Sequence, residues 1–157
     1  MRQPKEIVIC GLGNPLMSDE GIGLYVVREL AAKAQFADSI DFVELGSSLT
    51  DVVHTIAGRR KAVLVDCAFM NEPAGSMHRF TPDEVASEKA KFPLSLHQGD
   101  LLDMLELSRW LGEYPEEVVI YGIQPECVTM GDCLSPSLQQ RLGSYVTTIS
   151  TELQIST

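Results

Sequence analysis

Short, continuously apolar runs recur along the chain and predict buried β-strands. The clearest runs are 7–10, 62–65 and 118–123, and 41–45 predicts a further strand. Strands that are apolar on both faces are typical of parallel sheets covered by helices. The segment 76–80 alternates apolar and polar residues and follows 62–65 too closely for a helical crossover. We therefore expect it to be antiparallel or to lie at a sheet edge.

Between these runs, apolar residues recur at the three- and four-residue spacing of amphipathic helices. The spacing predicts helices over 21–34, 49–57, 97–111 and 135–153. A further short helix is expected to begin with Thr81 as its N-cap and Pro82 at its first position. The apolar positions of the 97–111 helix are Leu101, Met104, Leu105 and Trp110. Strands that alternate with helices predict an α/β fold, a three-layer α/β/α sandwich with a mostly parallel sheet of about five strands.

Length and composition are consistent with this architecture. The 157 residues are 45% hydrophobic and 22% charged, as in ordinary soluble domains. We expect one domain over 1–157. No apolar run approaches the roughly 18 residues of a membrane span, and the run at 7–12 is too short for a signal-peptide core. We therefore expect a cytoplasmic protein that does not contact a membrane. We also expect a monomer.

Charge and cysteine content narrow the range of partners. The chain has 12 Lys and Arg against 22 Asp and Glu, a formal net charge of −10. A nucleic-acid partner is not expected, because binding phosphates needs a cationic face. An acidic protein is suited to a basic peptide or a metal cation. We interpret the cysteines as reduced thiols, and the roles of the last two stay open: Cys10, Cys67, Cys127 and Cys133.

In open α/β sheets the ligand site lies beyond the carboxyl ends of the strands. The first strand is followed by a G-x-G sequence at 11–13, which begins like a dinucleotide-binding fingerprint. Leu16 stands where the third glycine belongs, so we do not expect a dinucleotide. The same loop carries Asp19 and Glu20 just before a predicted helix. One interpretation is that Ser18 or Asp19 caps this helix and Glu20 offsets its dipole.

Two further polar residues lie where a predicted strand ends or a predicted helix begins. Asp66 directly follows the apolar run 62–65, and a carboxylate there needs backbone amides, a cation or a metal as its partner. His97 opens a predicted helix, whose N-terminus favours the neutral imidazole that binds metals. Each residue alone has a structural explanation. Together, Glu20, Asp66 and His97 form a candidate divalent-metal site with room for further ligands.

The segment 11–23 resembles the opening of the nickel–iron hydrogenase maturation proteases, whose pattern is roughly G-x-G-N-x-L-x-x-D-D/E-x-x-G. The resemblance continues at the apolar strand ending in Asp66 and at His97-Gln98. It ends at 119–126, which is similar to a strand followed by G-I-x-P-E. The matches keep their order over about residues 6–135.

This resemblance implies a three-layer α/β/α fold and an endopeptidase. It implies removal of a C-terminal extension from the precursor of a hydrogenase large subunit after nickel insertion. It places metal ligands on Glu20, Asp66 and His97. On chemical grounds we expect Asp66 or Glu20 to be the general base. The nickel is expected to come with the substrate, and Cd²⁺ or Zn²⁺ to occupy the site in vitro. Asn14 and Asp19 are expected to support the site or its substrate loop.

One place departs from the family pattern. The family often has an Asp-Gly-Gly-Thr-like turn after the second strand, whereas 44–48 reads Glu-Leu-Gly-Ser-Ser. Gly46 and Ser47 keep part of this turn, which is associated with substrate recognition. The hydrogenase that is processed therefore stays open.

Two other functions are compatible with parts of the sequence. A non-catalytic module that binds or senses nickel would use the same three ligands, although such proteins usually carry more His and Cys. The segment 11–15 also resembles the start of peptidyl-tRNA hydrolases. However, those continue with Gly after the Pro and with an Asn-His pair, and this chain has neither feature.

Overall fold

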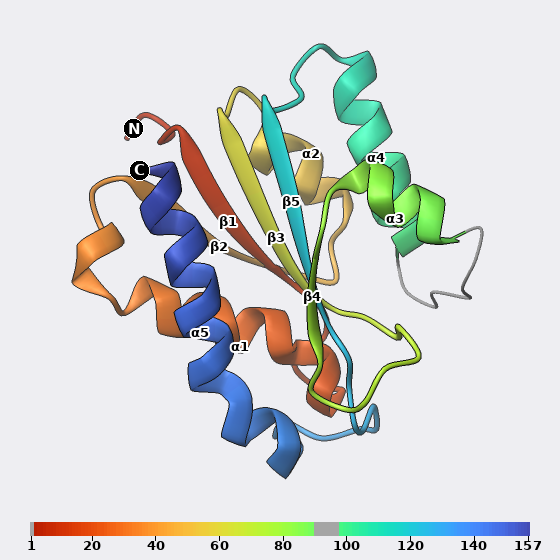
Figure 1. The fold of residues 1–157 in the computed structure, drawn as a ribbon. Coiled ribbons are helices and arrows are strands. Elements are labelled where there is room, and N and C mark those ends of the chain that lie inside the picture. Colours follow the sequence, from red (N-terminus) through yellow and green to blue (C-terminus); the bar gives the residue numbers. More distant parts are fainter. Residues whose placement is uncertain (1, 90–97) are drawn as a thin grey trace.

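The computed structural model describes residues 2–89 and 98–157. Five strands form one sheet in the order β2-β1-β3-β5-β4 (Figure 1). Neighbours among β1, β2, β3 and β5 are parallel, and β4 runs antiparallel to β5 at an edge. The predicted mostly parallel sheet with one antiparallel edge strand is confirmed. The strand bounds are β1 Ile7–Leu12, β2 Ile40–Gly46, β3 Lys61–Cys67, β4 Met77–Phe80 and β5 Glu117–Ile123.

Helices cover both faces of the sheet and complete the predicted three layers (Figure 1). One face carries α1 (Ile22–Ala31) and the long α5 (Pro136–Ser156). The other carries α2 (Thr50–Ile56), α3 (Pro82–Lys89) and α4 (Gln98–Trp110). None of these helices, all within the described residues, is long and apolar enough to cross a membrane.

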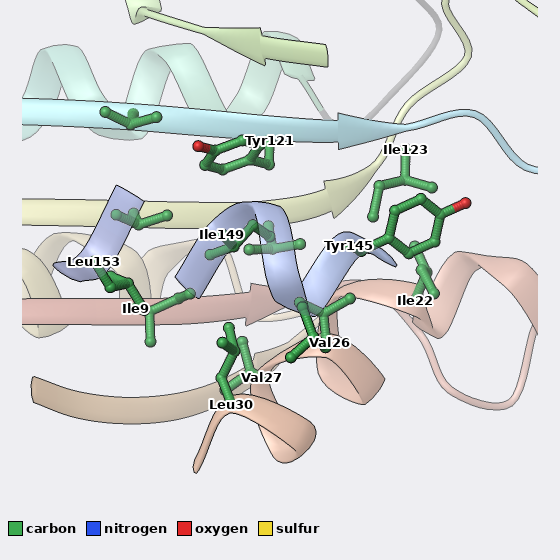
Figure 2. Packing of buried hydrophobic residues seen from close by; sticks show 14 of the residues in the cluster. Ile9, Ile22, Val26, Val27, Leu30, Tyr121, Ile123, Tyr145, Ile149 and Leu153 are labelled. Atoms are coloured by element: carbon green, nitrogen blue, oxygen red, sulfur yellow. The ribbon is translucent and has the colours of Figure 1, made fainter. Parts of the chain in front are cut away.

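Alternation along the strands divides the core between the two faces. Ile9 of β1 faces α1 and α5, where it packs with Val26, Ile149 and Leu153 (Figure 2). Its neighbour Val8 belongs to the cluster on the opposite face. All six residues of β1 are buried, as the continuous apolar run predicts. Full burial of one such aliphatic side chain stabilises the fold by about 1.5–3 kcal/mol.

Two predicted helices differ from the observed ones. The helix expected over 21–34 is preceded by a 3-10 turn, Ser18–Gly21, and α1 ends at Ala31. A second 3-10 turn follows at Ala34–Phe36, where the chain bends and buries Phe36 in the core. On α4, the last apolar position, Trp110, is 83% exposed.

A partly buried ion-pair cluster holds the end of α5 at the amino end of the sheet. The Lys61 side chain is 3% exposed, and its Nζ lies 3.3 Å from Glu152 Oε2. Arg79 Nε donates to Glu152 Oε1 over 2.6 Å, and the Tyr121 hydroxyl donates to the same oxygen. Lys61 also donates to Ser156 Oγ, one turn further along α5. Several bonds to one carboxylate make Glu152 the centre of this cluster.

The Glu152→Gln variant is expected to lose about 1–3 kcal/mol of stability near neutral pH, because charge-assisted hydrogen bonds become neutral ones. Burial by itself raises the pKa of Glu152, but the hydrogen bond from Arg79 and the charge of Lys61 outweigh it and hold the pKa below 4.5. A lowered folded-state pKa gives stability that is present above the unfolded pKa and lost as the pH falls through the folded pKa.

Urea unfolding near pH 7 and in the acid range measures this difference. The gap between wild type and Glu152→Gln should shrink as the pH falls below 4.5, toward and through the lowered folded pKa. Glu29→Gln, at an exposed position of α1, is the control and should match wild type at both pH values. An equal gap at both pH values would mean that the charge of Glu152 does not contribute.

Candidate active site

The loops that follow the parallel strands meet at one edge of the sheet (Figure 1). Backbone hydrogen bonds join them in pairs. Gly13 N donates to Gly46 O over 2.9 Å, which ties the loop after β1 to the end of β2. Ala68 N donates to Ile123 O over 2.8 Å, which ties the loop after β3 to the end of β5. This is the edge where the fold predicts a ligand site.

Glycines in the segment 11–23 allow the start of α1 to lie directly on the sheet. A Cβ atom at Gly23 would overlap the carbonyl oxygens of Leu12 and Val65. Gly13 has φ +115°, and a Cβ there would overlap the carbonyl oxygen of Glu20 and lie 3.6 Å from Asp66 Oδ1. Because Gly13 has no side chain, the Glu20 backbone and the Asp66 carboxylate can both lie close to it.

The sequence predicts that Asp66 directly follows the third strand. In the structure, Asp66 lies inside β3. The pairing of β3 with β5 continues through Asp66 opposite Gly122 and Cys67 opposite Ile123, which extends the strand. Asp66 is 4% exposed, and its Oδ1 accepts a hydrogen bond from Cys67 N over 2.8 Å. This buried carboxylate has the backbone-amide partner that desolvation demands.

The Cys67 thiol reports the electrostatics of the site. Burial raises its pKa well above the ordinary value, and the negative charges of Asp66, Glu20 and Asp19 raise it further. Cys67 is therefore a neutral thiol and a poor nucleophile at physiological pH. Three carboxylates within electrostatic range of one buried thiol make this edge strongly negative, which favours a bound cation.

Asp19 is fully buried and holds the loop after β5 against the turn that carries Glu20. Its Oδ2 accepts hydrogen bonds from Glu126 N and Cys127 N, both over 2.9 Å. Its Oδ1 accepts one from Ser135 N over 2.7 Å. The interpretation of Asp19 or Ser18 as the cap of α1 is wrong, because Gly21 occupies the N-cap position without a side-chain bond.

The other residues singled out in the sequence shape the same edge. Asn14 Oδ1 accepts a hydrogen bond from Leu16 N over 3.0 Å and so fixes the turn after β1. Gly46 has φ +60° at the end of β2 and accepts the bond from Gly13 described above. Ser47, next in the chain, is exposed. Asn14 and Gly46 thus hold the loops near Glu20 and Asp66, and Ser47 faces solvent beside them.

His97 lies outside the described residues, directly before α4 begins at Gln98. Within residues 2–89 and 98–157, no group of three or more His, Cys, Asp or Glu is arranged to hold a metal ion. Of the proposed trio, the structure places the Glu20 main chain and the Asp66 carboxylate beside Gly13. The contribution of His97 stays a prediction.

The sequence profile of the hydrogenase maturation proteases matches residues 24–152. The hydrogenase expression/formation protein HupD of Thiocapsa roseopersicina is 30% identical over 143 residues, which cover 90% of this chain and 65% of HupD. The hydrogenase 2 maturation protease of Escherichia coli is 26% identical over 133 residues, 85% of this chain and 81% of that protein. The chain spans only 65% and 59% of the lengths of the first two relatives.

Solved structures show the same fold. The hydrogenase maturating endopeptidase HybD from E. coli superimposes with a TM-score of 0.84 at 24% identity, covering 96% of this chain and 93% of HybD. The maturation protease HybD from Thermococcus kodakarensis gives 0.75 at 25% identity, covering 94% and 98%. The chain belongs to the hydrogenase maturation protease family.

Proposed function

We propose that this protein is an endopeptidase that removes the C-terminal extension of a nickel–iron hydrogenase large-subunit precursor once nickel has been inserted. The observation that carries the proposal is the buried Asp66 carboxylate beside the main chain of Glu20 at the carboxyl edge of the sheet, in a member of this family. The negative potential there suits a cation carried by the substrate. The free thiols at Cys10, Cys67, Cys127 and Cys133 support action in the reducing cytoplasm. We also propose that the protein is a monomer.

In this proposal, the nickel of the precursor contacts Glu20, Asp66 and His97 and fixes the register of the scissile bond. A water molecule attacks the scissile carbonyl, and one of the two carboxylates accepts its proton. The proton is then delivered to the leaving amide nitrogen, which departs as the amine of the extension. Without precursor, Cd²⁺ or Zn²⁺ is expected to bind the same three residues in vitro.

Cleavage of nickel-loaded precursor, and not of nickel-free precursor, is the expected result of incubation with the purified protein. The nickel-free precursor lacks the element that positions the bond. Mass spectrometry of the products should show one cut that releases one C-terminal peptide. Adding nickel back to the nickel-free precursor is the matched control and should restore the cut. Efficient cleavage without nickel would point instead to a general peptidase.

The same assay separates the two other candidate functions. A module that only binds nickel would leave the loaded precursor intact while still taking up the metal. A peptidyl-tRNA-hydrolase-like esterase would cut an ester-linked peptide and ignore the precursor. The family match over residues 24–152 favours the protease over both.

A further inference from the structure

Two large apolar side chains point into solvent beside the candidate active site. Leu16 is 65% exposed and Met130 is 90% exposed, on loops more than 100 residues apart in the chain. Backbone bonds join these loops: Gly131 N donates to Leu16 O, and Ser18 N donates to Gly131 O, both over 2.9 Å. We call residues 16–18 together with 129–131 the Leu16–Met130 platform.

One residue of the platform, Ser18, has a strained backbone conformation. Ser18 has φ +53°, a left-handed backbone that disfavours side chains with a Cβ. Its Oγ donates to Thr129 O over 2.8 Å, which fixes this conformation from the opposite loop. The next residue, Asp19, ties both loops together through its buried carboxylate. Strain that the surroundings maintain is typical of functional surfaces, so the outward placement of Leu16 and Met130 has a structural cause.

The two loops of the platform carry charge of one sign only. Residues 12–21 and 124–135 contain no Lys or Arg, whereas they contain Asp19, Glu20, Glu126 and Asp132. The side chains of Glu126 and Asp132 are exposed. An exposed apolar pair on loops that also expose the carboxylates of Glu126 and Asp132 complements a segment that has apolar side chains next to cationic ones.

We propose that the Leu16–Met130 platform docks a segment of the substrate protein in which apolar side chains stand beside Lys or Arg. This proposal rests on the proposed function, since it names the hydrogenase precursor as the occupant. Leu16 lies four residues before Glu20, and Asp19 joins both platform loops to the turn of Glu20. A segment bound here is therefore held next to the carboxylates that act on the scissile bond.

The double variant Leu16→Ser/Met130→Ser tests the apolar part. It is expected to raise KM for nickel-loaded precursor about 10-fold or more at nearly unchanged kcat, because it removes binding shared by ground and transition states. The matched control is Trp110→Ser/Ile155→Ser, which truncates apolar side chains 83% and 80% exposed at the other end of the sheet. An unchanged KM in the platform variant, or a KM raised equally by the control, would overturn the proposal.

The variant Glu126→Gln/Asp132→Asn tests the charge. Wild-type KM should rise with salt, and this variant should show a smaller rise because screening has less attraction to remove. Glu113→Gln/Glu116→Gln removes the same charge from exposed positions before β5 and should keep the wild-type salt dependence. The same salt dependence in both variants would exclude a cationic partner at the platform.

A binding measurement separates this proposal from the proposed function. Precursor affinity is measured by surface plasmon resonance in an Asp66→Asn background, in which turnover is expected to be slower by about 10²-fold or more. Weaker binding of the platform variant supports the docking surface even if wild type never cuts the precursor, an outcome that would refute the endopeptidase. Cleavage by wild type with equal affinities for platform and control variants would refute the docking surface alone. Absence of precursor binding by every variant would also overturn it.

Discussion

The Asp66→Asn variant is expected to lose about 10²-fold or more in the rate of precursor cleavage and to keep wild-type stability. Asparagine preserves the size of the side chain, and its Oδ1 can still accept the hydrogen bond from Cys67 N. What it removes is the charge that would contact a cation or accept a proton. Stability can even rise, because the substitution removes one of three negative charges near Cys67.

Cleavage kinetics and urea unfolding of the same preparations decide the outcome. Asp51→Asn is the matched control, since it makes the same chemical change at an exposed position in the first turn of α2. If Asp66→Asn keeps its activity, Asp66 only accepts the hydrogen bond from Cys67 N and takes no part in cleavage. Activity lost in proportion to stability would show that Asp66 holds the fold. The same reasoning applies to Glu20→Gln.

Local patterns predicted most of the sheet and its covering helices. Continuous apolar runs identified β1, β3 and β5, because strands buried on both faces leave no room for polar residues. Thr81 caps α3 as predicted: its Oγ1 accepts from Glu84 N over 3.3 Å, and Glu84 Oε2 accepts from Thr81 N over 3.0 Å. Such signals lie within four residues, so the sequence displays them directly.

The features that the sequence did not predict depend on distant partners. The amides that bind Asp19 lie 107 to 116 residues further along the chain, and no spacing rule connects them. The bend that buries Phe36 is set by the core, although the preceding residues favour helix. The left-handed backbone of Ser18 is likewise fixed by a bond to Thr129. The predicted positions of Glu20 and Asp66 at the ends of elements marked them as candidate site residues. Nothing local in the sequence predicted that Asp19 would bind the loop after β5.

The Asp19→Ala variant is expected to lose about 3–5 kcal/mol of stability, because the N–H groups of Glu126, Cys127 and Ser135 lose the carboxylate that they share. At about 2–4 °C per kcal/mol, the Tm should fall by roughly 6–20 °C. Asp19→Asn should be less damaging, since one oxygen still serves two of these amides while the new NH₂ group faces the third.

Cleavage by Asp19→Ala should fall even well below its Tm, because releasing the loop after β5 also releases the turn that carries Glu20. Calorimetry gives the Tm, and kcat measured about 20 °C below it reports the site in folded protein. Asp132→Ala removes an exposed carboxylate from the same loop and should keep both the wild-type Tm and the wild-type kcat. If Asp19→Ala had the same Tm as Asp132→Ala, the three hydrogen bonds to the Asp19 carboxylate would make no net contribution to stability. If it melted early but kept full kcat, the loop would stabilise the fold without positioning Glu20.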